Sequence, residues 1–450
     1  MGESSNLLRD LLNISARAVR LGERLDDPKT FLDLLEGSRR LGLSEEFCRR
    51  LLGLLVEEWE RAEGMAEKGE DGLRLRRFAA RAMELRKAGR KIVRLELGEP
   101  DFSASEKIVE AACEAIREGR TKYSSAAGLR ELKEELASNL SDRYGVDLKA
   151  ENIAVTAGGT LATYAAIEVL SKPGDSVMVV EPAWPLYAHQ VRRLGRRVVR
   201  IKTRVEDGWD PVEGIQERVS KLVKIIILNY PNNPTGKVLD RRSFKGLLDL
   251  AEDYDLWVVS DEVYIDFSYN GEAPSILEYD YPKTYYLNSF SKAWGMTGFR
   301  VGFVVSDPEI AKKVSGVLST VMTCVPEFIQ RAALAALRDE ESRRRNVELI
   351  GRRLKVLYEE LSRSRLIKLI PPEGAMYVFP KIEADGFSSW NFAEKLLERE
   401  GIAVAPGACF GEPYDNHLRI SAVVDEAELR DAARRIVKAV EEGIWRKDDA

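Results

Sequence analysis

The stretch that decides the fold is TYYLNSFSKAWGMTGFRVGFVV, residues 284–305, which places a single lysine, Lys292, between two apolar runs. Residues 284–288 and 301–305 have the pattern of two buried strands. Most lysines are solvated surface residues, but an ammonium group between interior strands is costly unless it is paired. Desolvation there lowers the pKa of the lysine toward the neutral amine, which is the form that makes Schiff bases. The stretch therefore indicates a chemical role for Lys292.

Further apolar runs precede this stretch and alternate with helical patterns. They are residues 153–156, 176–180, 198–201, 224–228 and 256–260. Runs of nearly continuous valine and isoleucine, spaced by helices, predict an α/β fold with a mostly parallel sheet covered on both faces. Ligands of such sheets bind beyond the carboxyl ends of the strands. We therefore expect the functional residues in the loops that follow these runs.

Polar and glycine-rich segments do follow the runs. Gly158, Gly159 and Thr160 open a helix after the first run, and bare backbone N–H groups at a helix N-terminus can bind an anion, although a glycine pair alone is more often a tight turn. Residues 229–236, NYPNNPTG, predict a rigid loop. Asp261 directly follows the run 256–260, where a buried carboxylate is costly without a cation, so we expect a cationic partner for it.

The composition excludes several classes of function. The 450 residues are 44% hydrophobic and 32% charged, which predicts a soluble globular chain with room for two or three domains. A formal charge of −5 gives no overall attraction to nucleic acid or to an anionic membrane. The chain has only two histidines, which argues against a histidine-assisted nucleophile and against a cluster of histidine metal ligands. No metal site is expected. Neither GxxxxGK[ST] nor GxGxxG occurs.

The spacing of the cysteines and the first residues of the chain indicate the cellular compartment of the protein. Four widely separated cysteines form no CxxC pair, which favours neither a disulfide framework nor a zinc site. The first residues lack the basic and apolar regions of a signal peptide, and no apolar run approaches the ~18 residues of a membrane helix. We expect a cytoplasmic protein.

The motifs of these loops, taken together and in order, resemble the class I/II aminotransferases among the fold-type I pyridoxal-phosphate enzymes, over residues 76–445. The resemblance rests on Asn-Pro-Thr-Gly at 233–236, Ser-Asp-Glu-Val-Tyr at 260–264, and Ser289-x-x-Lys292 followed eight residues later by Arg300. It implies a large domain, residues 121–309, with a mostly parallel mixed sheet between helices. It also implies a smaller α+β domain from residues 76–120 and 310–445, after an all-helical extension (1–64) and a linker (65–75).

The resemblance assigns roles around a pyridoxal 5'-phosphate cofactor. Lys292 would hold the cofactor aldehyde covalently and later act as general base and acid. Asp261 would pair with the pyridine nitrogen and keep the ring an electron sink. Asn233 and Tyr264 would form hydrogen bonds with the ring hydroxyl, and Trp184 would stack on the ring. The phosphate would be bound by Ser289, Arg300 and the turn Gly158-Gly159-Thr160.

Substrate and partner contacts follow from the same resemblance. Arg419 would grip the α-carboxylate of the substrate, because a planar guanidinium suits a two-pronged contact. Asn233 and the backbone of Gly98 would lie near the same carboxylate. Tyr123 would reach the phosphate of the neighbouring subunit, which implies a homodimer. Lys133 stands where the family usually has arginine, and this departure concerns the packing near Tyr123.

The implied activity moves an amino group between an L-amino acid, aspartate, aromatic or alanine-like, and a 2-oxo acid, with 2-oxoglutarate as the expected acceptor. Carbanion chemistry of other kinds on the same fold, such as β-elimination, stays open. A pyridoxal-phosphate-binding transcription regulator is a further alternative. Residues 1–75 carry 16 acidic and 12 basic side chains, whereas a DNA-binding module would be basic.

The N-terminal segment contains Asp27-Pro28, a helix start, and a second helical pattern that begins near Ser44. It faintly resembles a degenerate chorismate mutase domain, but Thr30-Phe31 stands where that family has Arg-Glu, so no mutase activity is expected. The resemblance is a weak hint of aromatic substrates. The apolar helix faces also suggest a module that packs on the enzyme itself, at the dimer or at the active-site entrance.

Overall fold

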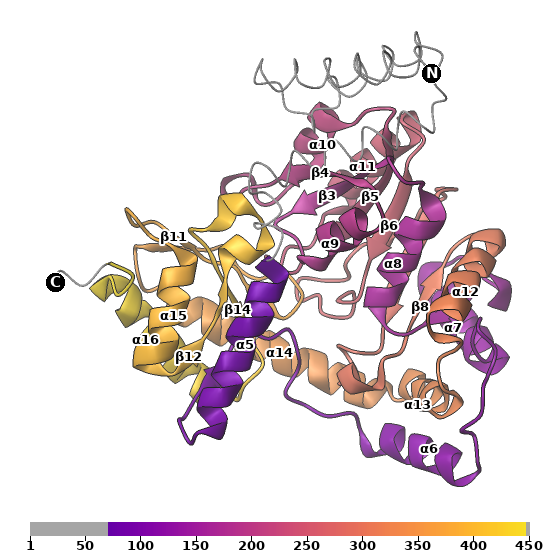
Figure 1. Cartoon of the computed structure of the whole chain (residues 1–450), viewed down its shortest axis with the longest axis horizontal. Coiled ribbons are helices and arrows are strands. Elements are labelled where there is room, and N and C mark those ends of the chain that lie inside the picture. Colours follow the sequence, from indigo (N-terminus) through magenta and orange to yellow (C-terminus); the bar gives the residue numbers. More distant parts are fainter. Residues whose placement is uncertain (1–70, 447–450) are drawn as a thin grey trace, which may run out of the picture.

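The computed structural model describes residues 71–446, which form a seven-stranded sheet flanked by helices and a smaller unit beside it (Figure 1). The strand order is β2-β8-β7-β6-β5-β3-β4. Strand β8 runs antiparallel to both of its neighbours, and the remaining pairs are parallel. The predicted mostly parallel mixed sheet is confirmed, and each of the seven predicted strands lies within one residue of its observed bounds. These are β2 (Ile153–Thr156), β3 (Ser176–Glu181), β4 (Arg197–Lys202), β5 (Val223–Asn229), β6 (Trp257–Asp261), β7 (Thr284–Ser289) and β8 (Gly302–Val305).

The strands are almost wholly apolar because both faces of the sheet are covered. In β3, Val177 and Val179 belong to one core and Met178 and Val180 to the other, since successive side chains of a strand point to opposite faces. The core that contains Val177 and Val179 also takes buried apolar residues from three helices, α8 (Gly159–Leu170), α9 (Leu186–Arg193) and α12 (Pro308–Met322). The core that contains Met178 and Val180 takes them from five, α6 (Glu106–Arg117), α7 (Arg130–Tyr144), α10 (Val212–Arg218), α11 (Arg241–Asp253) and α13 (Glu327–Leu337).

A smaller α+β unit brings the two ends of the described chain together. Strand β1 (Val93–Arg94) pairs in parallel with β12 (Ile402–Ala403), and helix α5 (Asp71–Lys87) lies beside the C-terminal elements (Figure 1). A third core joins these segments. The other elements of the unit are α14 (Glu340–Leu361), α15 (Ser389–Glu400), α16 (Glu426–Glu442), the pair β9 (Ile367–Lys368) and β11 (Lys381–Ile382), and the sheet of β10 (Tyr377–Val378), β14 (Leu418–Ser421) and β13 (Ala405–Pro406).

The expected N-terminal extension, 1–64, and most of the linker, 65–75, lie outside the described residues. Within residues 71–446, no helix is long and apolar enough to cross a membrane. The cysteines of this part form no disulfide with one another, and no group of three or more His, Cys, Asp or Glu side chains there could hold a metal ion. Four strands of the large sheet end at Thr156, Asn229, Asp261 and Ser289, so the loops predicted to carry function follow directly from the sheet.

Candidate active site

A cavity of about 390 Å³ lies at the carboxyl ends of these strands, against the smaller unit. The walls come from both parts of the fold: β5, β6 and β7 supply one side, and α5, β10 and β14 supply the other. Most of the residues singled out in the sequence line it. They are Gly98, Gly159, Thr160, Trp184, Asn233, Asp261, Tyr264, Ser289, Lys292, Arg300 and Arg419.

Lys292 lies in the loop that follows β7, between the strands that flank it in the sequence. Its Nζ donates a hydrogen bond to the carbonyl oxygen of Gly98, 2.6 Å away. Burial, and after it the positive charge of Arg419, lower the pKa of Lys292 to about 8. A substantial fraction of this amine is therefore neutral near physiological pH, as a nucleophile requires.

Asp261 is buried at the end of β6 and carries no ion pair in the described part of the chain. The hydroxyl of Tyr187 donates to its carboxylate at 2.5 Å, and the backbone N–H of Val263 donates at 3.3 Å. Among residues 71–446 a phenol and an amide supply its hydrogen bonds, and the cationic partner expected from the sequence stays a prediction. Burial raises the pKa of Asp261 to about 6, so a cation entering the cavity would stabilise its charged form.

A chain of amides leads from Asp261 to the arginine of the small unit. Asn229 donates to the backbone oxygen of Asp261 at 2.9 Å and accepts from the backbone N–H of Asn233 at 3.0 Å. Arg419 in turn donates to Oδ1 of Asn233 at 3.3 Å and to the backbone oxygen of Glu96. Its guanidinium lies 4.7 Å from the ring centre of Tyr377. These contacts fix Arg419 on the cavity wall, with its Nε left without a hydrogen-bond partner.

Two phenols meet on the same wall. The hydroxyls of Tyr264 and Tyr377 are 2.7 Å apart, and both side chains are buried. A side chain at Gly98 would overlap the Tyr377 hydroxyl, so the loop over the cavity can approach this closely only because residue 98 is glycine.

The glycine turn, Ser289 and Arg300 gather at the start of α8. Arg300 donates to the backbone oxygens of Ala157 at 3.3 Å and of Thr297 at 3.0 Å. Gly158 does not line the cavity. Its φ is +79°, and a Cβ there would stand 2.8 Å from Arg300 Nη2, so the absence of a side chain at residue 158 leaves room for the Arg300 guanidinium. Helix α8 begins at Gly159 without a side-chain cap. Its free amides, a serine hydroxyl and a guanidinium together suit a phosphate.

Two other predicted aromatic residues, Trp184 and Tyr123, have different positions. Trp184 lines the cavity and packs edge-to-face on Tyr187, with ring centres 5.3 Å apart. Tyr123 lies outside the cavity, and its side chain is 86% exposed.

Several lining residues were missed in the sequence. Tyr187 stands three residues after Trp184, one helical turn away, and that spacing was the available signal. Glu96 and Tyr377 lie in segments without a motif, so only the folded structure brings them to the cavity. Arg94 holds Glu96 through two hydrogen bonds to one carboxylate oxygen, 2.6 and 2.9 Å long. Arg76 of α5 also lines the cavity.

The fold and the site together define an enzyme of the fold-type I pyridoxal-phosphate class, and solved structures of that class match over most of their length. The aspartate aminotransferase of Thermus thermophilus with maleate has a TM-score of 0.77 and 35% identity, and the match covers 81% of this chain and 96% of that one. The aromatic aminotransferase of Pyrococcus horikoshii has a TM-score of 0.76 and 32% identity, and the match covers 82% of this chain and 100% of that one. The chain belongs to the family Aminotransferase class I and II, whose model matches residues 90–436.

Relatives of known name agree with this assignment. An aspartate aminotransferase of Pyrococcus horikoshii is 38% identical over 356 residues, which cover 78% of this chain and 91% of the relative. An aspartate/prephenate aminotransferase of Thermus thermophilus is 36% identical over a match that covers 80% of this chain and 94% of the relative. An arginine–pyruvate transaminase of Pseudomonas aeruginosa is 35% identical over a match that covers 79% of this chain and 92% of the relative. The predicted family is confirmed, and the protein is an enzyme that transaminates amino acids.

Proposed function

We propose that the chain binds pyridoxal 5'-phosphate in this cavity and transfers the amino group of a dicarboxylic amino acid, aspartate first, to 2-oxoglutarate. The observation that carries the proposal is Asp261, a buried carboxylate that faces the cavity, lies near Lys292 and has no ion pair in residues 71–446. A protonated pyridine nitrogen would supply the missing cation. When bound, this cofactor withdraws the negative charge that develops at the substrate α-carbon.

The lining residues fit the cofactor group by group. Lys292 would hold it covalently, Asp261 would pair with the pyridine nitrogen, and Trp184 would stack on the ring. Hydrogen bonds to the ring hydroxyl would come from Asn233 and Tyr264. The phosphate would lie against Gly159, Thr160, Ser289 and Arg300, with the Gly158 backbone giving Arg300 room.

The side chains of this site bind the substrate and move its proton. Arg419 presents a guanidinium already oriented by Asn233 and the Glu96 backbone, so it can bind the α-carboxylate without first being ordered. When the substrate occupies the site, the Nζ of Lys292 would take the substrate's α-proton as a general base. The lowered pKa favours this role, since a base works best with a pKa near the operating pH.

Arg76 supports a dicarboxylic substrate. The cavity is lined by four cations, and three of them, Lys292, Arg300 and Arg419, donate hydrogen bonds to backbone oxygens. The structure gives no hydrogen bond or ion pair to the exposed side chain of Arg76 within the described chain. A second substrate carboxylate would complete it. Relatives whose names specify aspartate point to the same class of substrate.

A homodimer completes the proposal. Tyr123 does not line the cavity of its own chain and is 86% exposed. We propose that it reaches the phosphate end of the cavity in a second copy of the chain.

Visible absorbance of the purified protein, recorded while amino acids are added one at a time, tests the proposed function. Aspartate should convert the bound cofactor to its amine form, and 2-oxoglutarate should restore the original band. Lys292→Ala should lose the covalent link and the turnover. Accumulation of pyruvate and ammonia in place of the reversible change would indicate elimination, and a protein that takes up no cofactor would overturn the proposal.

Arg76→Ala tests the substrate class. We expect KM for aspartate and for 2-oxoglutarate to rise about tenfold or more, because a charged hydrogen bond contributes about 1.5–3 kcal/mol. Rates with alanine and phenylalanine should stay unchanged. Arg81→Ala is the matched control, since Arg81 lies on the same helix but is bonded to Glu398 and does not line the cavity. Equal losses for all four compounds would argue against a role in recognition.

A further inference from the structure

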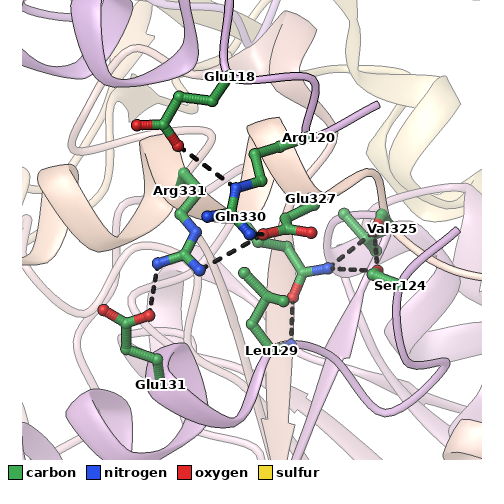
Figure 2. Close-up of polar contacts among 9 residues, drawn as sticks. All are labelled: Glu118, Arg120, Ser124, Leu129, Glu131, Val325, Glu327, Gln330 and Arg331. Carbon is green, nitrogen blue, oxygen red and sulfur yellow. Dashed lines mark hydrogen bonds and ion pairs between the residues drawn. The ribbon is translucent and has the colours of Figure 1, made fainter. Parts of the chain in front are cut away.

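The segment that carries Tyr123, residues 118–131, connects α6 to α7 and contains no regular helix or strand before α7, yet α13 holds it firmly (Figure 2). Gln330 of α13 makes the central contact. Its side chain is fully buried; its Oε1 accepts from the backbone N–H of Leu129 at 2.7 Å, and its Nε2 donates to the backbone oxygen of Val325 at 2.8 Å and to Ser124 Oγ at 3.2 Å. One carboxamide thus binds the segment at two places and the start of its own helix at a third.

Ser124 is the residue next to Tyr123, and both its backbone N–H and its hydroxyl form hydrogen bonds. Its backbone N–H donates to Cys324 Sγ at 3.3 Å, and its hydroxyl donates to the backbone oxygen of Val325 at 3.0 Å. The ring of Tyr123 nevertheless stays 86% exposed. An immobilised backbone that presents an exposed aromatic ring is typical of a surface that contacts another molecule.

The charged contacts around this cluster cannot replace Gln330. Arg120 lies near Glu118 and Glu327, and Arg331 near Glu131 and Glu327 (Figure 2). Most of these side chains are partly exposed, and ion pairs of that kind contribute little to stability. A buried carboxamide that uses both its donor and its acceptor costs more to remove, because its buried and partly buried partners lose their hydrogen bonds.

We propose that Gln330 is a positioning residue that acts in trans: it fixes the segment so that Tyr123 is set for the cofactor phosphate in a second copy of the chain. The inference rests on the proposed function, which supplies the cofactor and the dimer. It follows that the loss of Gln330 weakens the cofactor site of the other subunit, although Gln330 does not line the cavity of its own.

The dissociation constant for pyridoxal phosphate, measured by fluorescence on the cofactor-free protein, tests this through a double-mutant cycle. Gln330→Met keeps the volume and removes both hydrogen-bonding functions, and Tyr123→Phe removes the hydroxyl. Each should raise the constant about tenfold, and the double variant should bind no more weakly than the weaker single one. Independent, additive losses would overturn the inference. Ser124→Ala, which removes one hydroxyl, provides a milder substitution should Gln330→Met fold poorly.

Hybrid dimers separate an action in trans from local damage. In a hybrid of Gln330→Met with Lys292→Ala, the site that keeps Lys292 receives Tyr123 from the chain with an intact Gln330. That site should bind the cofactor as tightly as the unaltered protein, whereas a weak site would overturn the inference. If the unaltered protein takes up no pyridoxal phosphate, the proposed function fails; if it binds normally and the cycle is additive, only the role of Gln330 fails.

Discussion

At the residue scale, the chemistry depends on a balance of charges around one amine. Burial and Arg419 lower the pKa of Lys292, whereas the carboxylates of Glu99 and Asp261 raise it, and the result is a pKa of about 8. Lys292 differs in this from an exposed lysine, whose pKa is about 10.4. The same Arg419 that is proposed to bind the substrate therefore also prepares the nucleophile.

This balance predicts a pH dependence for cofactor uptake. The neutral amine is the form that attacks the cofactor aldehyde, and it predominates above its pKa. The rate at which cofactor-free protein incorporates pyridoxal phosphate should therefore rise with pH and reach half of its plateau near pH 8. Arg419→Met removes a positive charge, so the pKa of Lys292 should rise and the midpoint should move to higher pH. Stopped-flow absorbance measures both profiles, and a rate that is still climbing at pH 10 in the unaltered protein would contradict the assignment.

At the element scale, the ends of strands decide which parts of the site a sequence can predict. The strands were predictable because each is buried on both faces and is nearly all apolar, and the loops after β5, β6 and β7 carry distinctive polar motifs. Glu96 and Tyr377 have no such motif, because they reach the cavity from the small unit through tertiary packing, whereas Tyr187 is signalled only by its helical spacing from Trp184. The hydrogen bond from Tyr187 to Asp261 is visible only in the folded structure, and the cationic partner expected for Asp261 stays a prediction.

The turn before α8 gives a prediction with a matched control. Gly158 and Gly145 both have a positive φ, +79° and +69°, but a Cβ at Gly158 would meet the Arg300 guanidinium, whereas one at Gly145 would meet nothing within 4 Å. Replacing either by alanine should cost about 1–3 kcal/mol of unfolding free energy. Only Gly158→Ala should also weaken pyridoxal-phosphate binding, about tenfold, because Arg300 is displaced. Urea unfolding and cofactor titration check the two effects separately, and equal cofactor affinities in the two variants would contradict the role of the turn.

At the scale of the whole molecule, the cavity belongs to two units that meet only when the chain is folded. The large sheet supplies Lys292 and Asp261, and the small unit supplies Arg419, so neither could assemble the site alone. The parallel pair β1–β12 joins segments about three hundred residues apart, which places the start of α5 at the cavity beside the C-terminal strands. The proposed contact of Tyr123 with a second copy of the chain would extend this dependence to a dimer.

Exposed apolar residues of α6 and α12 provide the test at this scale. Ile116 at the end of α6 is 47% exposed and Val321 near the end of α12 is 55% exposed. Both helices lie on the side of the molecule away from α15 and α16 (Figure 1). Ile116→Lys would bury a charge in the proposed dimer interface, so sedimentation velocity should show a shift toward monomer. The affinity for pyridoxal phosphate should fall with it, because each site loses the partner's tyrosine. Tyr254→Lys, at a 36% exposed position that follows α11, should change neither. A monomer that binds the cofactor as tightly as the dimer would show instead that each chain completes its own site.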